Sequence, residues 1–221
     1  MFKAEEYINT LTEHLKTEYK NRLIYIGLQG SYLRGEATEN SDIDIMVVIR
    51  DITVADLEAY RNIISSLHDY DKSCGFICGL QELQNWNPLE ICHLLHTTND
   101  YYGTLAELVP EYTENDVRTF VKMSIGNIYH ELCHRYVHTS KENSIAMIPF
   151  TYKPVFFVLQ NVHYLESGVF LGTKNELSKA LTGTDKLILD TAISLSRGEV
   201  FDFDKAFSLL FEWCKEKLLK V

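Results

Sequence analysis

Hydrophobic residues recur at two different spacings along this chain of 221 residues. Near the N-terminus, apolar residues three to four positions apart predict an amphipathic helix over about residues 3–18. The inward face of that helix would carry Ile8, Leu11 and Leu15. Two nearly continuous apolar runs follow at residues 23–28 and 43–49, and runs of this length that are rich in β-branched residues are typical of buried strands.

Helix and strand signals continue to about residue 98. Thr53 is a typical N-cap residue and predicts a helix through about His68. The inward residues of this helix are expected to be Leu57, Ile63, Ile64 and Leu67. Residues 73–78 form a short apolar strand candidate bounded by glycines, and residues 82–86 begin more helical sequence.

Turn signals cluster at residues 99–103 and at Pro110, and beyond them the strand pattern disappears. Thr113 and Asp116 have the spacing of a capping box, which predicts the start of a long helix through about Val137. Further helices are expected at about residues 152–170, 174–181, 184–196 and 203–219, separated by glycines.

The change of pattern indicates an α+β fold in two domains. Residues 1–110 would form a small mixed sheet flanked by helices. Residues 111–221 would form an all-α helical bundle. The chain is long enough for each of these parts to bury a hydrophobic core.

The charge and hydropathy of the chain narrow the choice of partners and location. A formal net charge of -10 disfavours an extended nucleic-acid footprint, although it is compatible with a polycationic substrate. No apolar run is long enough to span a bilayer, and the sequence starts without the apolar core of a signal peptide. We therefore expect a cytoplasmic protein that binds neither nucleic acid nor membrane.

Cysteine usage favours reduced thiols. The five cysteines are odd in number and scattered, and most have apolar neighbours, so we expect free and mostly buried side chains. A zinc site built from Cys74, Cys78 and His93 is disfavoured, because their spacing matches no common structural site.

Candidate chemistry is concentrated around the first two predicted strands. Gly30 and Ser31 end the first strand and would let backbone amides and a hydroxyl approach phosphate oxygens at a strand-to-helix turn. Asp42 and Asp44 are two residues apart in the second strand, so both carboxylates should lie on one face. Two hard oxygen ligands suit Mg²⁺, and Arg34 could neutralise charge on a transferring phosphate.

These residues resemble the signature of the DNA polymerase β-like nucleotidyltransferase superfamily. That signature is Gly-Ser, a spacer and then Asp-x-Asp, which stand here at Gly30-Ser31 and at Asp42-x-Asp44 after Ser41. The resemblance implies a nucleotidyltransferase that uses ATP or another nucleoside triphosphate and binds Mg²⁺ through the two aspartates. The residues expected to hold the nucleotide are Gly30, Ser31, Arg34 and Ser41.

The order of the two halves looks like that of the kanamycin-type aminoglycoside nucleotidyltransferases. That resemblance implies transfer of AMP from ATP to a hydroxyl of a small molecule such as an aminoglycoside-like antibiotic, hence a role in antibiotic resistance, and it leaves a homodimer open. It also implies a general base on the long helix. Glu131 is the preferred base because it is the only acid there, while His130 and His134 stay open as alternatives.

Two departures from the pattern leave other functions open. The superfamily usually has a third carboxylate on a neighbouring strand, but Cys74 stands at about that place, and only Asp71 or Glu82 could substitute. The alternative is therefore a regulatory, antitoxin-type protein with this fold that binds or modifies a protein partner. Residues 130–134 also satisfy the H-E-x-x-H pattern of zinc hydrolases, but no third-ligand signature follows.

Overall fold

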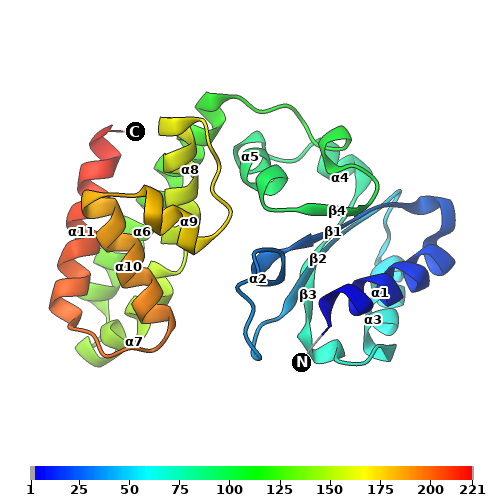
Figure 1. Cartoon of the computed structure of the whole chain (residues 1–221), viewed down its shortest axis with the longest axis horizontal. Coiled ribbons are helices and arrows are strands. Elements are labelled where there is room, and N and C mark those ends of the chain that lie inside the picture. The colour runs from blue at the N-terminus through cyan, green and yellow to red at the C-terminus, as the bar shows by residue number, and fades with distance from the viewer. Residues whose placement is uncertain (1–2, 221) are drawn as a thin grey trace. The chain divides into compact units, whose positions relative to one another are not determined.

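The computed structural model describes residues 3–220. The chain divides into two compact units between Tyr112 and Thr113. Each unit has its own hydrophobic core (Figure 1).

A four-stranded mixed sheet forms the centre of the first unit. Its strands lie in the order β3-β2-β1-β4. They are β1 (Leu23–Gln29), β2 (Ile43–Ile49), β3 (Ser73–Gly79) and β4 (Asn99–Tyr102). β1 pairs antiparallel with both β2 and β4, whereas β3 runs parallel to β2. The predicted small mixed sheet is confirmed.

Helices cover both faces of this sheet (Figure 1). On one face, α1 (Ala4–Tyr19) and α3 (Val54–Ser66) pack with a cluster that includes Ile43 and Ile45. On the other face, α4 (Leu80–Gln84) and α5 (Pro88–His96) pack with Met46 and its neighbours. Because both faces of β1 and β2 are buried, these two strands appear in the sequence as continuous apolar runs rather than as alternating ones.

Short elements complete the first unit. They are α2 (Gly30–Leu33) and three 3₁₀ turns, η1 (Lys20–Arg22), η2 (Tyr70–Lys72) and η3 (Leu105–Glu107). α2 begins directly where β1 ends, as the predicted strand-to-helix turn requires.

The first turn of α3 is fixed by a buried carboxylate that the sequence pattern did not reveal. Asp56 forms a capping box with Thr53 and accepts hydrogen bonds of 3.0 and 2.6 Å from the Arg22 guanidinium. The Tyr19 hydroxyl donates to the Asp56 carbonyl at 2.7 Å. These bonds turn Asp56 inward, and Leu57, which was predicted to face inward, is 42% exposed. That prediction was wrong because a polar anchor sets the rotation of the helix.

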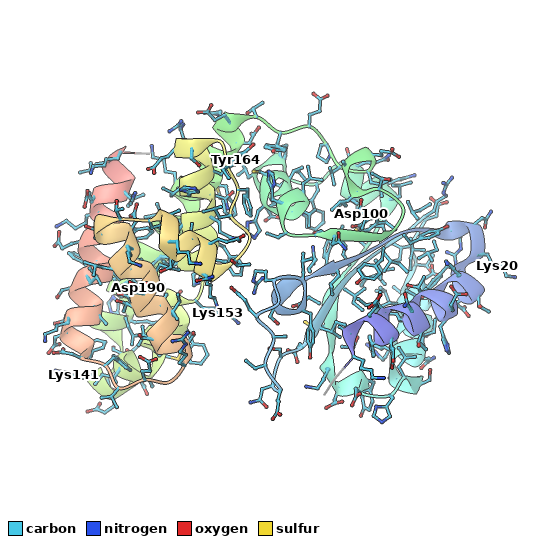
Figure 2. All side chains as sticks on the ribbon, viewed as in Figure 1. Lys20, Asp100, Lys141, Lys153, Tyr164 and Asp190 are labelled. Carbon is cyan, nitrogen blue, oxygen red and sulfur yellow. The ribbon has the colours of Figure 1, made fainter. Side chains whose placement is uncertain are left out.

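Residues 99–102 also differ from expectation. They were predicted as turns, but they form the edge strand β4, and all four residues are exposed. Asp100 of β4 (Figure 2) accepts a hydrogen bond of 2.6 Å from the buried Tyr25 hydroxyl of β1. Pairing with β1 therefore makes a strand of residues whose local preference is for turns.

The second unit consists only of helices in the part that the structure describes, which confirms the predicted bundle. The long helix α6 (Glu114–His138) starts at a Thr113–Asp116 capping box, as predicted. The other helices are α7 (Lys141–Tyr152), α8 (Val155–Ser167), α9 (Lys174–Ala180), α10 (Gly183–Ser196) and α11 (Phe203–Lys220). α7 was not predicted, and it contains a proline at position 149.

A half-buried carboxylate joins two of these helices. Asp185, in the first turn of α10, accepts hydrogen bonds of 2.7 Å from the Trp213 indole and 2.6 Å from Lys217, both on α11. Trp213 itself is 1% exposed. This contact holds α10 and α11 in register beside the core of the bundle.

Within residues 3–220, no helix combines the length and the apolar character that crossing a bilayer requires.

The Asp56 anchor leads to a stability prediction. Hydrogen bonds from Arg22, and secondarily from Thr53, lower the pKa of Asp56, so the ionised form stabilises the fold above the unfolded-state pKa of about 4. Asp56→Asn should lower the midpoint of thermal unfolding by a few degrees or more at neutral pH. The difference from wild type should shrink as the pH falls toward about 3, because the unfolded-state carboxyl then becomes protonated.

Glu58→Gln is the matched control, since Glu58 is an exposed acid on the same helix. It should leave the midpoint nearly unchanged at both pH values. An Asp56→Asn difference that stays constant between neutral and acidic pH would contradict the assigned charge pairing.

Candidate functional site

A glycine turn and a carboxylate touch at the end of β1. Gly30 has φ +70°, a conformation that L side chains rarely adopt, and a Cβ atom built on it would lie 1.9 Å from Oδ2 of Asp44. The register of β1 and β2 explains this contact, because Gln29 pairs directly with Asp44. The backbone amides that start α2 therefore lie beside a carboxylate, as the predicted phosphate turn and acid pair require.

The two aspartates lie at the beginning of β2. Asp44 is within the strand and half-buried, while Asp42 is exposed and immediately precedes it. After the larger effect of desolvation, the negative charges of Asp44 and Asp42 raise the pKa of the Cys74 thiol. That the two carboxylates bind one metal ion stays a prediction.

Cys74 lies directly beside Asp44 in the parallel register of β2 and β3. A side-chain hydrogen bond with Asp44 contributes to its raised pKa. A neutral thiol thus stands where the sequence comparison expected a third carboxylate. Thiols are soft ligands and poor partners for Mg²⁺, which prefers oxygen.

Glu82, one of the two suggested substitutes for the third acid, does not lie beside Asp44. Glu82 lies at the far end of β3, where a Cβ atom on Gly79 would be 2.0 Å from Oε2 of Glu82. Gly79 is five residues along the strand from Cys74, which corresponds to roughly 16 Å. Asp71 is exposed in η2, just before β3 starts. Glu82 is therefore excluded as a ligand of the Asp42–Asp44 site, and Asp71 stays open.

Three other residues were expected to bind the nucleotide, namely Ser31, Arg34 and Ser41, and each has a different environment. Ser31 is half-buried in the first turn of α2. The guanidinium of Arg34 pairs with Glu36 at 3.0 Å. The hydroxyl of Ser41 accepts a hydrogen bond of 2.9 Å from the Thr38 amide and so closes the turn before β2. Ser41 therefore has a structural role in shaping the loop that carries Asp42.

Gln29 and His93 lie near residues of the site, and neither was expected to bind nucleotide or metal there. Gln29 donates to the Thr98 hydroxyl at 2.8 Å, which anchors the end of β1 beside Asp44. Burial, and secondarily the positive charge of Arg34, lowers the pKa of His93 to about 4. His93 is thus a neutral imidazole near Arg34. A correct register of β1 against β2 would have placed Gln29 beside Asp44. No local sequence signal places His93 near Arg34.

Glu131 lies on α6, in the second unit. Its Oε1 accepts hydrogen bonds of 2.8 Å from Arg135 and 3.3 Å from the Thr151 hydroxyl. The rings of His130 and His134 are exposed, with centroids 5.9 Å apart. The Glu131 carboxylate is thus paired with the Arg135 side chain on the same helix. This pairing does not support a zinc-hydrolase site at residues 130–134.

The donor set at Asp42 and Asp44 is compatible with one Mg²⁺ ion. Mg²⁺ is usually held by one or two carboxylates, with substrate phosphates and water completing its octahedron. Over the described range 3–220, no group of three or more His, Cys, Asp and Glu side chains is arranged to hold a metal. The ion would therefore depend on the oxygens of its substrate.

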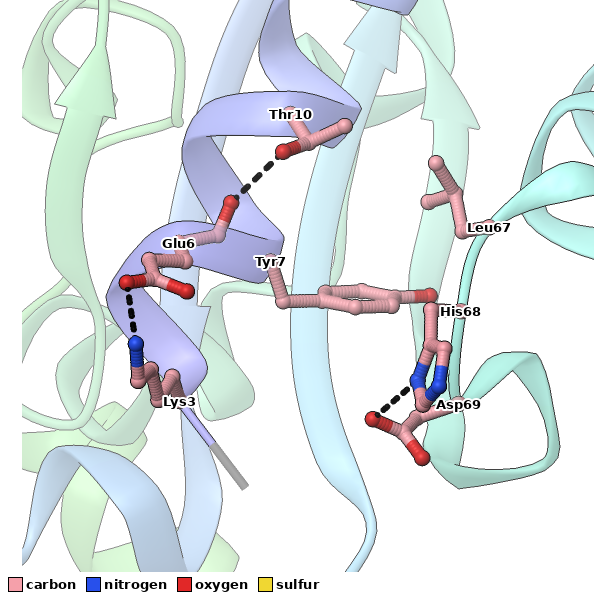
Figure 3. Close-up of a pocket in the computed structure, with 7 residues that line it drawn as sticks. All are labelled: Lys3, Glu6, Tyr7, Thr10, Leu67, His68 and Asp69. Atoms are coloured by element: carbon pink, nitrogen blue, oxygen red, sulfur yellow. Dashed lines mark hydrogen bonds and ion pairs between the residues drawn. The ribbon is translucent and has the colours of Figure 1, made fainter. Parts of the chain in front are cut away.

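The first unit contains a cavity at α1 and the segment that follows α3 (Figure 3). It is lined by Lys3, Glu6, Tyr7, Thr10, Leu67, His68 and Asp69. Tyr7 and Leu67 belong to the core cluster on the α1–α3 face, whereas Met46, on the same face as Asp44, belongs to the cluster on the opposite face. Its charged groups pair with each other, as Lys3 with Glu6 and His68 with Asp69. The cavity is therefore not the candidate site.

Comparison with known sequences points to one family for the first unit. Residues 8–73 match the sequence model of the nucleotidyltransferase domain. A Methanocaldococcus jannaschii protein described as a candidate protein adenylyltransferase is 48% identical over 44 residues, which are 20% of this chain and 44% of that protein. The chain therefore matches less than half of the length of this curated relative.

Comparison with solved structures supports the fold of the whole chain. The spectinomycin adenyltransferase AAD(9) from Enterococcus faecialis is 17% identical, with a TM-score of 0.59, and the match covers 98% of this chain and 100% of that one. A toxin-antitoxin structure solved with AMP-PNP is 23% identical and covers 58% of this chain and 92% of that one. Its TM-score of 0.33 is too low to support an argument.

The contact between Gly30 and Asp44 predicts the effect of one added methyl group. Gly30→Ala would force Cβ into Oδ2 of Asp44 and should weaken binding of a nucleoside triphosphate with Mg²⁺ at least about tenfold, as measured by isothermal titration calorimetry.

Gly35→Ala is the matched control. Gly35 has a similar φ of +67°, but a Cβ atom there would have nothing within 4 Å. It should retain the wild-type affinity apart from any effect of backbone strain. Equal losses in the two variants would show that strain, and not the contact with Asp44, is responsible.

Proposed function

For a chain whose residues 8–73 form a nucleotidyltransferase domain, we propose an adenylyltransferase that moves AMP from ATP to a hydroxyl of a small molecule in the presence of Mg²⁺. The observation that carries this proposal is the direct approach of the Gly30 backbone to Asp44. Further support comes from the fold, which resembles an adenyltransferase solved with ATP and spectinomycin.

In this proposal the first unit binds the donor. Amides at Gly30 and Ser31 hold phosphate oxygens, and Arg34 adds positive charge beside them. Asp42 and Asp44 hold Mg²⁺ through their carboxylates. The bound ion would supply positive charge that stabilises the phosphate oxygens during transfer.

The acceptor hydroxyl attacks the α-phosphorus of ATP in line with the leaving group. A new O–P bond forms, the bond to the bridging oxygen of pyrophosphate breaks, and pyrophosphate leaves with the electron pair. We assign the hydroxyl proton to the Glu131 carboxylate, and His130 and His134 remain alternative acceptors of that proton. Glu131 would accept this proton while its Oε1 is paired with Arg135 at 2.8 Å.

The proposed acceptor is an aminoglycoside-like antibiotic, which would make the protein a resistance factor. The net charge of -10 is compatible with a polycationic acceptor. We further propose a cytoplasmic location and a homodimer, the latter testable by light scattering on the purified chain.

The enzyme proposal is tested by product formation. The protein is incubated with Mg²⁺, ATP and a panel of hydroxyl-bearing antibiotics, and we expect pyrophosphate together with one product heavier by an adenylyl group. Asp44→Asn should reduce the rate at least about 100-fold, because it removes a charged ligand of the reacting site. Asp51→Asn, an exposed acid beyond the other end of β2, should leave the rate unchanged. Measurable ATP binding without any product would contradict the proposal.

A second candidate function is favoured by Cys74. Because a thiol replaces a carboxylate beside Asp44, the chain could bind nucleotide with little or no transfer to small molecules and act on a protein partner instead. The description of the curated relative as a candidate protein adenylyltransferase is consistent with a protein acceptor. Adenylylation of a protein tyrosine, or co-purification with a partner chain, would favour this regulatory function.

Substitution of Cys74 separates the two functions. If the missing carboxylate limits transfer to small molecules, Cys74→Asp should increase the rate of product formation at least about tenfold, whereas Cys74→Ser, which adds no charge, should not. Product yield is measured by mass spectrometry under saturating ATP. If Cys74→Asp forms product more slowly than the wild-type protein, the thiol itself is suited to the reaction.

A further inference from the structure

Two histidines lie side by side on the last turn of α6. His134 and His138 are four residues apart, and their ring centroids are separated by 4.9 Å. Both side chains are exposed, and neither makes a hydrogen bond or an ion pair with any residue between 3 and 220. Residues four apart share one face of a helix, so both imidazoles are available to one external partner.

The separation of these rings matches that of two imidazoles on one metal ion. With metal–nitrogen bonds of about 2.0–2.1 Å, each ring centre lies roughly 3.2 Å from the metal. Two such rings at a ligand–metal–ligand angle of about 100–110° would have centroids roughly 4.9–5.2 Å apart. The observed 4.9 Å falls in that range without any rearrangement of the backbone.

The pair one turn earlier fits less well. The centroids of His130 and His134 are 5.9 Å apart, which would need an angle of roughly 134° at a shared metal. With the side chains as they lie, His134 and His138 fit a shared ion better; this pair shares His134 with the H-E-x-x-H pattern and adds His138 one turn later.

The local charge also favours a cation at this position. His138 is the last residue of α6, and the C-terminal end of a helix carries partial negative charge. The nearest cations in the sequence already face carboxylates, since Arg135 pairs with Glu131 at 2.8 Å and Lys141 lies 3.9 Å from Asp204. Repulsion of a metal ion by these groups is thereby reduced.

We propose that His134 and His138 form a two-imidazole site for a borderline transition-metal ion such as Ni²⁺, Cu²⁺ or Zn²⁺. Imidazole nitrogen suits these ions, and water would fill the remaining coordination positions. Its nitrogen ligands differ in kind from the carboxylate oxygens of Asp42 and Asp44, which suit Mg²⁺. Binding would close the last turn of α6 with a metal bridge.

The test is isothermal titration of the full, untagged chain with Ni²⁺. We expect one saturable site in the wild-type protein. His134→Gln and His138→Gln should each weaken binding at least about tenfold, because one imidazole cannot chelate. His130→Gln is the matched control, since it removes an exposed histidine of the same helix one turn away, and it should change the affinity less than about twofold.

Three results would overturn the proposal. They are the absence of saturable Ni²⁺ binding, an equal loss in His130→Gln and His138→Gln, and full binding in the double variant His134→Gln/His138→Gln. All of these positions are exposed on the helix, and a circular dichroism spectrum of each variant shows whether the helix content is kept. Since Gln has a good helix propensity, we expect no change in that spectrum.

Discussion

The close approach of Gly30 to Asp44 is the constraint on which the candidate site depends. A side chain at position 30 would displace the Asp44 carboxylate, because its Cβ would lie 1.9 Å from Oδ2. The antiparallel register of β1 and β2 creates the contact by pairing Gln29 with Asp44. Backbone amides and carboxylate are thus brought together by hydrogen bonding of the sheet rather than by a flexible loop.

The parallel pairing of β2 and β3 explains why a thiol, and not a third carboxylate, lies beside Asp44. It places Cys74 directly beside Asp44, while Glu82 is at the opposite end of the same strand. In the proposed function, Asp42 and Asp44 would hold Mg²⁺ and leave its remaining coordination to the substrate and water. In our proposal the two carboxylates bind the nucleoside triphosphate together with Mg²⁺. Cys74, which lies beside them, controls the rate of transfer.

Much of this architecture could be predicted from local sequence signals. The buried strands β1 and β2 and the capped starts of α3 and α6 depend on apolar runs and on short-range hydrogen bonds, so their residues alone indicated them. The inward position of Asp56 and the strand at 99–102 depend on Arg22 and Tyr25, which are distant in the sequence. Tertiary contacts override local preference at those positions. For the same reason the position of His93 near Arg34 could not be predicted.

The most direct test of this account is a crystal structure of the full chain with Mg²⁺ and a non-hydrolysable ATP analogue. We predict one Mg²⁺ bound by carboxylate oxygens of Asp42 and Asp44 and by phosphate oxygens, with the phosphates against the amides of Gly30 and Ser31. The Cys74 sulfur should not coordinate the ion. Phosphates bound elsewhere in the chain, or a metal held without Asp44, would contradict the central claim.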